Sequence, residues 1–280
     1  MRFDTHLHVW WPGDGAAIRI RSTLPALDRA FTLEAVRPAL RAAGVDRVLL
    51  VSSAPHASDT ERLLAVAADN TDLVAGVIGW LDLEAPTLAG TLARARANPL
   101  WLGARLPLTI LDDRSFIERP AVIAGLGALR DAGAIAEILA APDQLAAVAG
   151  VLRQLPGLAA IIDHAGNPDF SAPPTAAWRT GMDRLAALPG TVCKLSAFWA
   201  PGDPPVSPER ALAFFRHVLA AFGPDRVIAA ANWPVSALLG PYAASWDLLA
   251  QLAGDAGLSA DESARIFAGT ADALVRNATP

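Results

Sequence analysis

Cysteine is almost absent from this sequence, which has only Cys193 in 280 residues. A single cysteine forms no internal disulfide and cannot build a zinc site of clustered thiolates. This is typical of an intracellular chain. Residues 1–6 also lack the apolar core of a signal peptide, and no run reaches the roughly eighteen apolar residues of a membrane span. We therefore expect a cytoplasmic protein with no membrane partner.

Charge is scarce as well. Charged residues make up 18% of the chain and hydrophobic residues 53%, and the net charge of −5 is scattered without a basic run. The sequence therefore carries no electrostatic footprint for nucleic acid or for an anionic membrane. The composition predicts a well-buried globular protein that binds a small-molecule substrate, and it leaves formation of a homo-oligomer open.

A glycine-rich phosphate loop is missing after the first predicted strand, which argues against a dinucleotide-binding fold. Instead, short apolar segments alternate with segments of helical pattern. This alternation predicts a parallel sheet, and eight units without a linker favour one α/β domain over residues 1–280, a TIM (β/α)8 barrel. The first predicted strand ends within residues 3–10, and the others are 47–52, 73–80, 101–106, 134–139, 158–163, 191–196 and 226–232.

Capping patterns predict where several helices begin. One helix starts near Thr32 and closes at Gly44. Others are expected at Ser58 with Glu61, at Ser207 before Pro208, and at Ser259 with Glu262.

Polar side chains stand at the C-terminal ends of the predicted strands, where a barrel opens its active site. His6 and His8 are two residues apart in a strand, so both imidazoles project from one face and could hold a divalent metal or orient a substrate. His164 ends another apolar strand, where packing gives no reason for an imidazole. We expect these three histidines to converge in one pocket. Further polar or tryptophan side chains lie at or just after strand ends at Ser52, Ser53, Trp80, Asp82, Arg105, Glu137, Asp163, Lys194, Ser196, Asn232 and Trp233.

Two cations among these residues have alternative interpretations. Arg105 offers a planar fork for a carboxylate or a polarised carbonyl, or it is a structural cation of the barrel floor. Lys194 could bind substrate in the same way, or it could be the buried partner of Glu137. His56 and His217 are expected to be ordinary residues.

Aromatic residues and one loop could shape the pocket. A polar loop with Arg19 and Arg21 is long enough to fold over a site as a lid. The tryptophans near strand ends would line a pocket or simply fill the barrel mouth; they are Trp10, Trp80, Trp199 and Trp233.

Together these residues resemble a known group. The sequence is similar to the amidohydrolase-related (amidohydrolase 2) family, within the branch of sugar lactonases and 2-pyrone-4,6-dicarboxylate hydrolases. The resemblance covers nearly the whole chain. Its motifs are Asp4-Thr5-His6-Leu7-His8-Val9-Trp10, residues 76–83, Gly103-Ala104-Arg105, residues 162–168, Cys193-Lys194-Leu195-Ser196, and residues 222–226 running to Asn232-Trp233-Pro234-Val235.

The resemblance implies a distorted TIM barrel that opens a lactone made from a sugar acid or an aromatic breakdown product. His6, His8 and His164 would hold one divalent metal such as zinc, or the substrate carbonyl directly, since the branch is mixed in its need for metal. An acid on the eighth strand would activate water. Arg105 would fix the substrate, with Trp80, Lys194, Ser196 and Trp233 as further substrate-binding residues. The fifth strand offers Glu137 and no histidine, so only a mononuclear site is expected.

Asn232 departs from this pattern, because an amide cannot take a proton from water as a carboxylate can. It is an engineered substitution, a natural branch, or a loss of activity. Ala230 and Ala231 also differ from the Gly-Ser of lactonase relatives, which favours natural divergence. His164, Glu137 or a metal-bound hydroxide would then replace the base. A ligand-binding barrel with no catalysis or different catalysis stays as the alternative, with an isomerase or decarboxylase as a weaker one.

Overall fold

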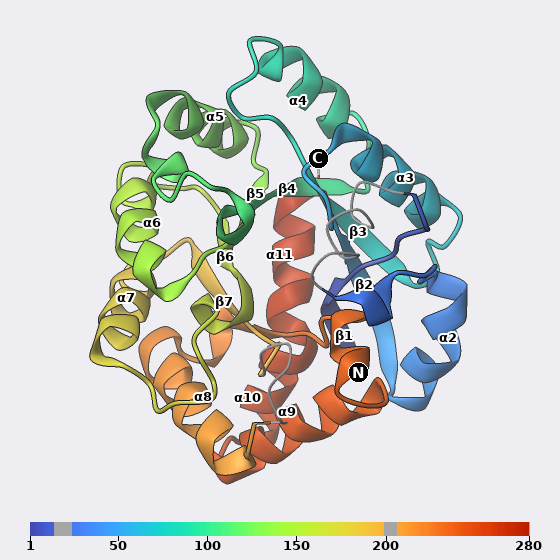
Figure 1. Cartoon of the computed structure of the whole chain (residues 1–280), viewed down its shortest axis with the longest axis vertical. Helices are drawn as coiled ribbons and strands as arrows, with labels where there is room; N and C mark the ends of the chain where they lie inside the picture. Colours follow the sequence, from blue (N-terminus) through green and yellow to red (C-terminus); the bar gives the residue numbers. More distant parts are fainter. Residues whose placement is uncertain (14–23, 199–205, 280) are drawn as a thin grey trace.

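The computed structural model describes residues 1–13, 24–198 and 206–279. Its eight strands form one parallel sheet in chain order, β1 to β8, and helices alternate with them around the outside (Figure 1). The predicted (β/α)8 barrel is confirmed. The strands are β1 (Arg2–Leu7), β2 (Val45–Val51), β3 (Val74–Gly79), β4 (Trp101–Pro107), β5 (Ile135–Leu139), β6 (Ala160–Ile162), β7 (Thr191–Leu195) and β8 (Val227–Ala229).

The helices follow the strands as predicted. The loop with Arg19 and Arg21 that was predicted as a lid lies outside the described residues, and so does Trp199. In this part of the chain no helix is long and apolar enough to cross a membrane. The α-helices are α2 (Leu33–Ala42), α3 (Ala57–Ala68), α4 (Leu88–Arg96), α5 (Pro120–Asp131), α6 (Leu145–Leu152), α7 (Ala176–Ala186), α8 (Pro208–Phe222), α9 (Ala243–Asp255), α10 (Ala260–Ala264) and α11 (Thr270–Ala278).

The predicted helix starts are confirmed at three places and wrong at one. Thr32, Ser207 and Ser259 each accept a hydrogen bond from a first-turn amide. The helix predicted from Ser58 and Glu61 is present as α3, but it begins one residue before Ser58. Its N-cap is His56, whose Nδ1 accepts from the Ser58 amide at 3.3 Å.

An apolar layer, to which every strand contributes, fills the end of the barrel interior next to α11. The π-helical turn Arg265–Gly269 and α11 pack against this layer through Ala268, Ala271, Val275 and Ala278, which closes one end of the barrel. In Figure 1, α11 runs through the centre of the ring of strands and helices. The inward side chains are Phe3, Leu49, Val51, Ile78, Leu102, Ile135, Ile161, Val192 and Ile228.

The next inward layer is charged. Side chains alternate across a strand, so positions two residues apart point to the same side. Glu137 therefore follows Ile135 into the barrel, Asp163 follows Ile161, and Lys194 follows Val192. All three charged side chains are fully buried. The site thus stands directly above the apolar layer.

The seam between β1 and β8 is where the barrel is distorted. Among the described residues, one backbone bridge joins the end of β1 to the segment after β8, at Leu7 and Trp233, where the His8 amide donates to the Trp233 carbonyl at 2.8 Å. Side chains complete the closure. The buried Asp4 carboxylate accepts from the Ala231 amide at 3.0 Å and from the Tyr242 hydroxyl at 2.7 Å. Burial first, and then the Asp4 charge, raises the pKa of the Tyr242 phenol well above its usual value, so this hydroxyl stays protonated and donates.

Replacing Tyr242 by Phe should therefore weaken the seam. The variant leaves one oxygen of the buried Asp4 carboxylate without its hydroxyl donor, at a cost of about 1–3 kcal/mol in the free energy of unfolding. Urea unfolding of both proteins measures this difference. An unchanged midpoint and slope would show that the Asp4–Tyr242 bond does not hold the barrel closed.

Candidate active site

The two histidines of β1 converge through one nitrogen each. His6 Nε2 lies 3.1 Å from His8 Nε2, and both residues are buried. His8 Nδ1 is 2.8 Å from the Val51 carbonyl oxygen. A carbonyl only accepts, so Nδ1 carries the proton and the neutral ring keeps its lone pair on Nε2, facing His6.

His164 joins them because the chain turns sharply after β6. His164 and Ala165 adopt left-handed conformations, with φ of 52° and 54°, which are strained for residues with a side chain. The turn brings the His164 ring to 4.7 Å from the His6 ring, centroid to centroid. His164 Nδ1 lies 2.7 Å from the Ser196 hydroxyl oxygen, on β7's C-terminal side.

Burial keeps two of the imidazoles neutral. It lowers the pKa of His8 well below its usual value, and the neighbouring His6 and Arg105 lower it further. Burial also lowers the pKa of His164 well below the usual value, although the Asp163 carboxylate opposes the shift. Near pH 7 both rings are therefore free to accept a proton or to bind an electrophile.

Lys194 connects the charged layer beneath these rings. Its Nζ lies 2.6 Å from Glu137 Oε2, 3.2 Å from Asp163 Oδ1 and 2.9 Å from His6 Nδ1. Burial alone would raise the pKa of Asp163, but the charges of Lys194, His6 and Arg105 outweigh it and hold that pKa well below its usual value. Lys194 is also the only lysine in the sequence.

Arg105 completes the network from β4. Its Nη1 donates to the Ser52 carbonyl at 2.8 Å, and Nε and Nη2 each lie 3.3 Å from Asp163 Oδ2. Nη2 is also 3.3 Å from His6 Nε2. The side chain is 8% exposed and lines a cavity of about 200 Å3 with Trp80.

Asn232 and Trp233 follow β8 at the same end. Asn232 has a φ of 57°, a left-handed conformation that asparagine tolerates better than most residues. Its carbonyl accepts from the Ser236 amide, while no hydrogen bond to another described residue holds its side-chain amide. The Trp233 ring packs against Phe31, with centroids 5.4 Å apart.

Comparison with known proteins identifies the family of this chain. The amidohydrolase family model matches residues 3–276. The chain belongs to the amidohydrolase family. It is 33% identical to an L-fucono-1,5-lactonase of Burkholderia ambifaria over 272 residues, covering 96% of this chain and 93% of the relative. A second L-fucono-1,5-lactonase, from Burkholderia multivorans, is 31% identical over 297 residues, with 97% and 94% covered.

Solved structures show the same barrel. An amidohydrolase from Burkholderia multivorans with bound zinc superimposes with a TM-score of 0.91 at 28% identity, covering 99% of both chains. A probable 2-pyrone-4,6-dicarboxylic acid hydrolase from Acinetobacter baumannii has a TM-score of 0.81 at 18% identity, covering 98% of this chain and 99% of that one, and so supports the fold alone.

In this amidohydrolase the structure brings most of the predicted site residues together. His6, His8, His164, Arg105 and Lys194 form one connected cluster, and Ser196 joins it through His164. His56 and His217 lie elsewhere: His56 caps α3, and His217 pairs with Asp183 between α7 and α8.

Two overlapping sets of donors in this cluster could hold a metal. His6, Asp163 and His164 offer atoms within 4.8 Å of one another. His6 and His8 offer Nε2 atoms 3.1 Å apart, close to the spacing of two nitrogens bound at about 2.0–2.1 Å to one zinc ion. Burial keeps the His8 and His164 imidazoles neutral, which suits them as ligands, and together with His6 they fit one divalent ion.

Replacing Lys194 by Met should unfold this amidohydrolase more easily, because Glu137 and Asp163 lose their shared buried cation. A loss of about 3–5 kcal/mol in the free energy of unfolding is expected. Urea unfolding measures it, with Arg276→Met on the exposed face of α11 as the control, expected within about 0.5 kcal/mol of the natural protein.

The double variant Lys194→Met with Glu137→Leu removes an uncompensated anion and should recover part of the lost stability. If Lys194→Met behaves like the Arg276 control, the ammonium does not hold the charged layer together.

Proposed function

We propose that this amidohydrolase opens the lactone ring of a sugar acid by hydrolysis. The observation that carries the proposal is the convergence of three buried histidines, two of them held neutral, above a charged layer at the C-terminal end of the barrel. The two lactonases to which the chain is similar support this substrate class. Neutral, correctly placed imidazoles favour catalysis over mere ligand binding.

Water addition to a lactone carbonyl needs a base, and Asn232 cannot be that base. Glu137 is unsuited because it is fully buried and its carboxylate faces Lys194 and His6. His164 is kept neutral by burial, and it contacts Ser196, which lines the cavity beside β7 and β8. In the proposed reaction its ring takes a proton from water as the new C–O bond forms, and it returns the proton to the ring oxygen as the ester bond breaks.

The remaining residues orient the lactone and stabilise charge. Arg105 is held rigidly by Ser52 and Asp163, so its cation stands ready for the oxyanion that develops on the carbonyl oxygen. The side-chain amide of Asn232, which has no hydrogen bond to another described residue, would form one with a substrate hydroxyl. Trp80 and Trp233 would form walls of the mouth, and Ser196 orients His164.

His6, His8 and His164 would be the ligands of a divalent metal. His164 Nδ1 faces Ser196, so its other ring nitrogen would then serve the metal and not accept the proton from water. When bound, zinc would polarise the lactone carbonyl and make water more acidic. Lys194 contacts the opposite side of His6: its ammonium lies 2.9 Å from Nδ1, and Nε2 faces Arg105 and His8. The cytoplasmic location and a homo-oligomeric state stay predictions.

The direct test is an assay of the purified protein on a panel of sugar-acid 1,5-lactones and 1,4-lactones and on 2-pyrone-4,6-dicarboxylate, with and without added zinc. His164→Asn should lower kcat/KM at least about 100-fold, in the range of lost acid–base catalysis. Asparagine tolerates the left-handed backbone of residue 164, so the fold should remain. His217→Asn is the matched control and should keep full activity.

The pH profile gives a second readout. Because burial lowers the pKa of His164, the ring stays neutral at pH 7 and protonates only as the pH falls through the lowered value. Activity should therefore stay level from pH 8 to below 6.5 and decline only at more acidic pH. No turnover of any lactone by the natural protein, with or without metal, contradicts the proposed function.

Asn232→Asp tests the identity of the base. Aspartate has the same side-chain shape as asparagine, and it also tolerates a left-handed backbone. If His164 is the base, the natural protein hydrolyses a lactone and the introduced carboxylate changes kcat/KM by less than about tenfold. Activity confined to the variant would assign the base to position 232 and mark Asn232 as an inactivating residue.

A further inference from the structure

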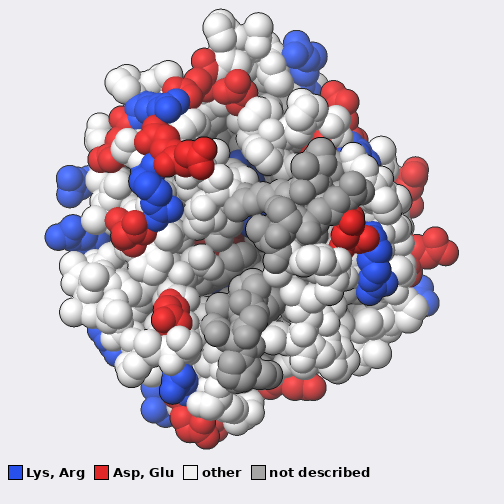
Figure 2. All heavy atoms as spheres, viewed as in Figure 1, with Lys and Arg blue, Asp and Glu red and all other residues white. Residues whose placement is uncertain are grey.

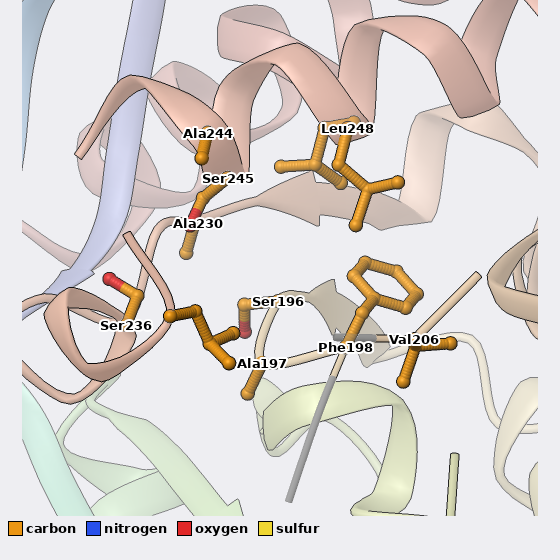
Figure 3. Close-up of a pocket in the computed structure, with 11 residues that line it drawn as sticks. Ser196, Ala197, Phe198, Val206, Ala230, Ser236, Ala244, Ser245 and Leu248 are labelled. Carbon is orange, nitrogen blue, oxygen red and sulfur yellow. The ribbon is translucent and has the colours of Figure 1, made fainter. Parts of the chain in front are cut away.

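A second cavity adjoins the histidines on the side of β7 and β8. It has a volume of about 220 Å3, large enough for several carbon atoms. Ser196 belongs to both places, because its hydroxyl contacts His164 and its side chain lines the cavity. Figure 3 shows Phe198, Val206 and Leu248 on one side of the cavity, with the serines and Ala230 on the other.

The lining of this cavity is apolar, apart from three serines. None of the described residues that line it is charged. Ser236 is 5% exposed, and its hydroxyl oxygen has no hydrogen-bond partner among the described residues. A buried hydroxyl without a partner is costly, so a ligand with one oxygen near it would gain a hydrogen bond there.

The cavity on the other side of the site differs in chemistry. It contains Arg105, Asp82 and Glu84 beside Trp80, and it contacts the histidines through the Arg105–His6 hydrogen bond. A lactone at the histidines therefore has a charged wall on the β3–β4 side and an apolar wall on the β7–β8 side. In Figure 2, acidic and basic side chains lie mainly around the periphery of this face, and the visible described atoms near its hollowed centre are mostly uncharged.

We propose that the cavity of Ser196, Phe198, Ser236 and Leu248 is the subsite for an apolar ring substituent of the lactone. The enzyme then prefers neutral lactones with an alkyl group over lactones with a carboxylate at the same place. This inference rests on the proposed function, since it places the lactone carbonyl at the histidines. A carboxylate in this cavity would face no cation among the described lining residues, which is unfavourable.

The test is a series of δ-lactones with hydrogen, methyl, ethyl or propyl on the carbon that bears the ring oxygen, together with the corresponding carboxylate. Each buried methylene should raise kcat/KM about fourfold, from the free energy of apolar burial. The carboxylate should react more slowly than the unsubstituted lactone.

Filling the cavity should remove this preference. Ala244→Phe, on the α9 side of the lining, should abolish the gain from ethyl and propyl relative to the unsubstituted lactone assayed with the same variant. Ala250→Phe is the control. Both alanines are exposed on α9, but Ala250 does not line the cavity.

Three results would overturn the subsite: no rise along the alkyl series, a preference for the carboxylate, or equal effects of the two Phe variants. Calorimetric binding of the ring-opened hydroxy acids separates this inference from the proposed function. Alkyl-dependent binding that Ala244→Phe removes, without turnover, would keep the subsite and reject hydrolysis. Turnover without any alkyl dependence would keep hydrolysis and reject the subsite.

Discussion

The ammonium of Lys194 is the constraint on which the rest of the site depends. A fully buried cation is stable only with close anionic partners, because the cost of removing it from water is several kcal/mol. Glu137 comes from β5, Asp163 from the end of β6 and Lys194 from β7, so their contacts require these strands to hold one register. The same ammonium contacts His6 from β1, across the barrel.

The layered interior explains why the site lies at one end. A strand period of two places charged residues directly above an apolar layer on three successive strands. The apolar layer is closed from below by α11, so the charged layer and the histidines can open only at the other end. Left-handed residues then follow β6, β7 and β8 at His164, Ala197 and Asn232, where the strands give way to the loops of the mouth.

The sequence was sufficient for the strand order because each buried parallel strand is a short apolar run with a polar end. It could not predict β8's early end, since the predicted strand ran to Asn232 and the seam instead uses the Asp4 side chain. The Asp4–Tyr242 bond joins residues 238 positions apart, and no local pattern marks it. The pairing of Lys194 with Glu137, one of its two predicted roles, is confirmed. Its further contact with Asp163 depends on the register of three strands and could not be predicted. The capping role of His56 was missed because it depends on ring orientation.

A crystal structure of the protein with the hydroxy acid product of a hydrolysed lactone would locate the reaction in the barrel. The new carboxylate should lie beside His164 and Arg105, at the end of the barrel where β6 and β4 finish. A carboxylate bound away from the histidines, with His6, His8 and His164 untouched by the product, would contradict this placement.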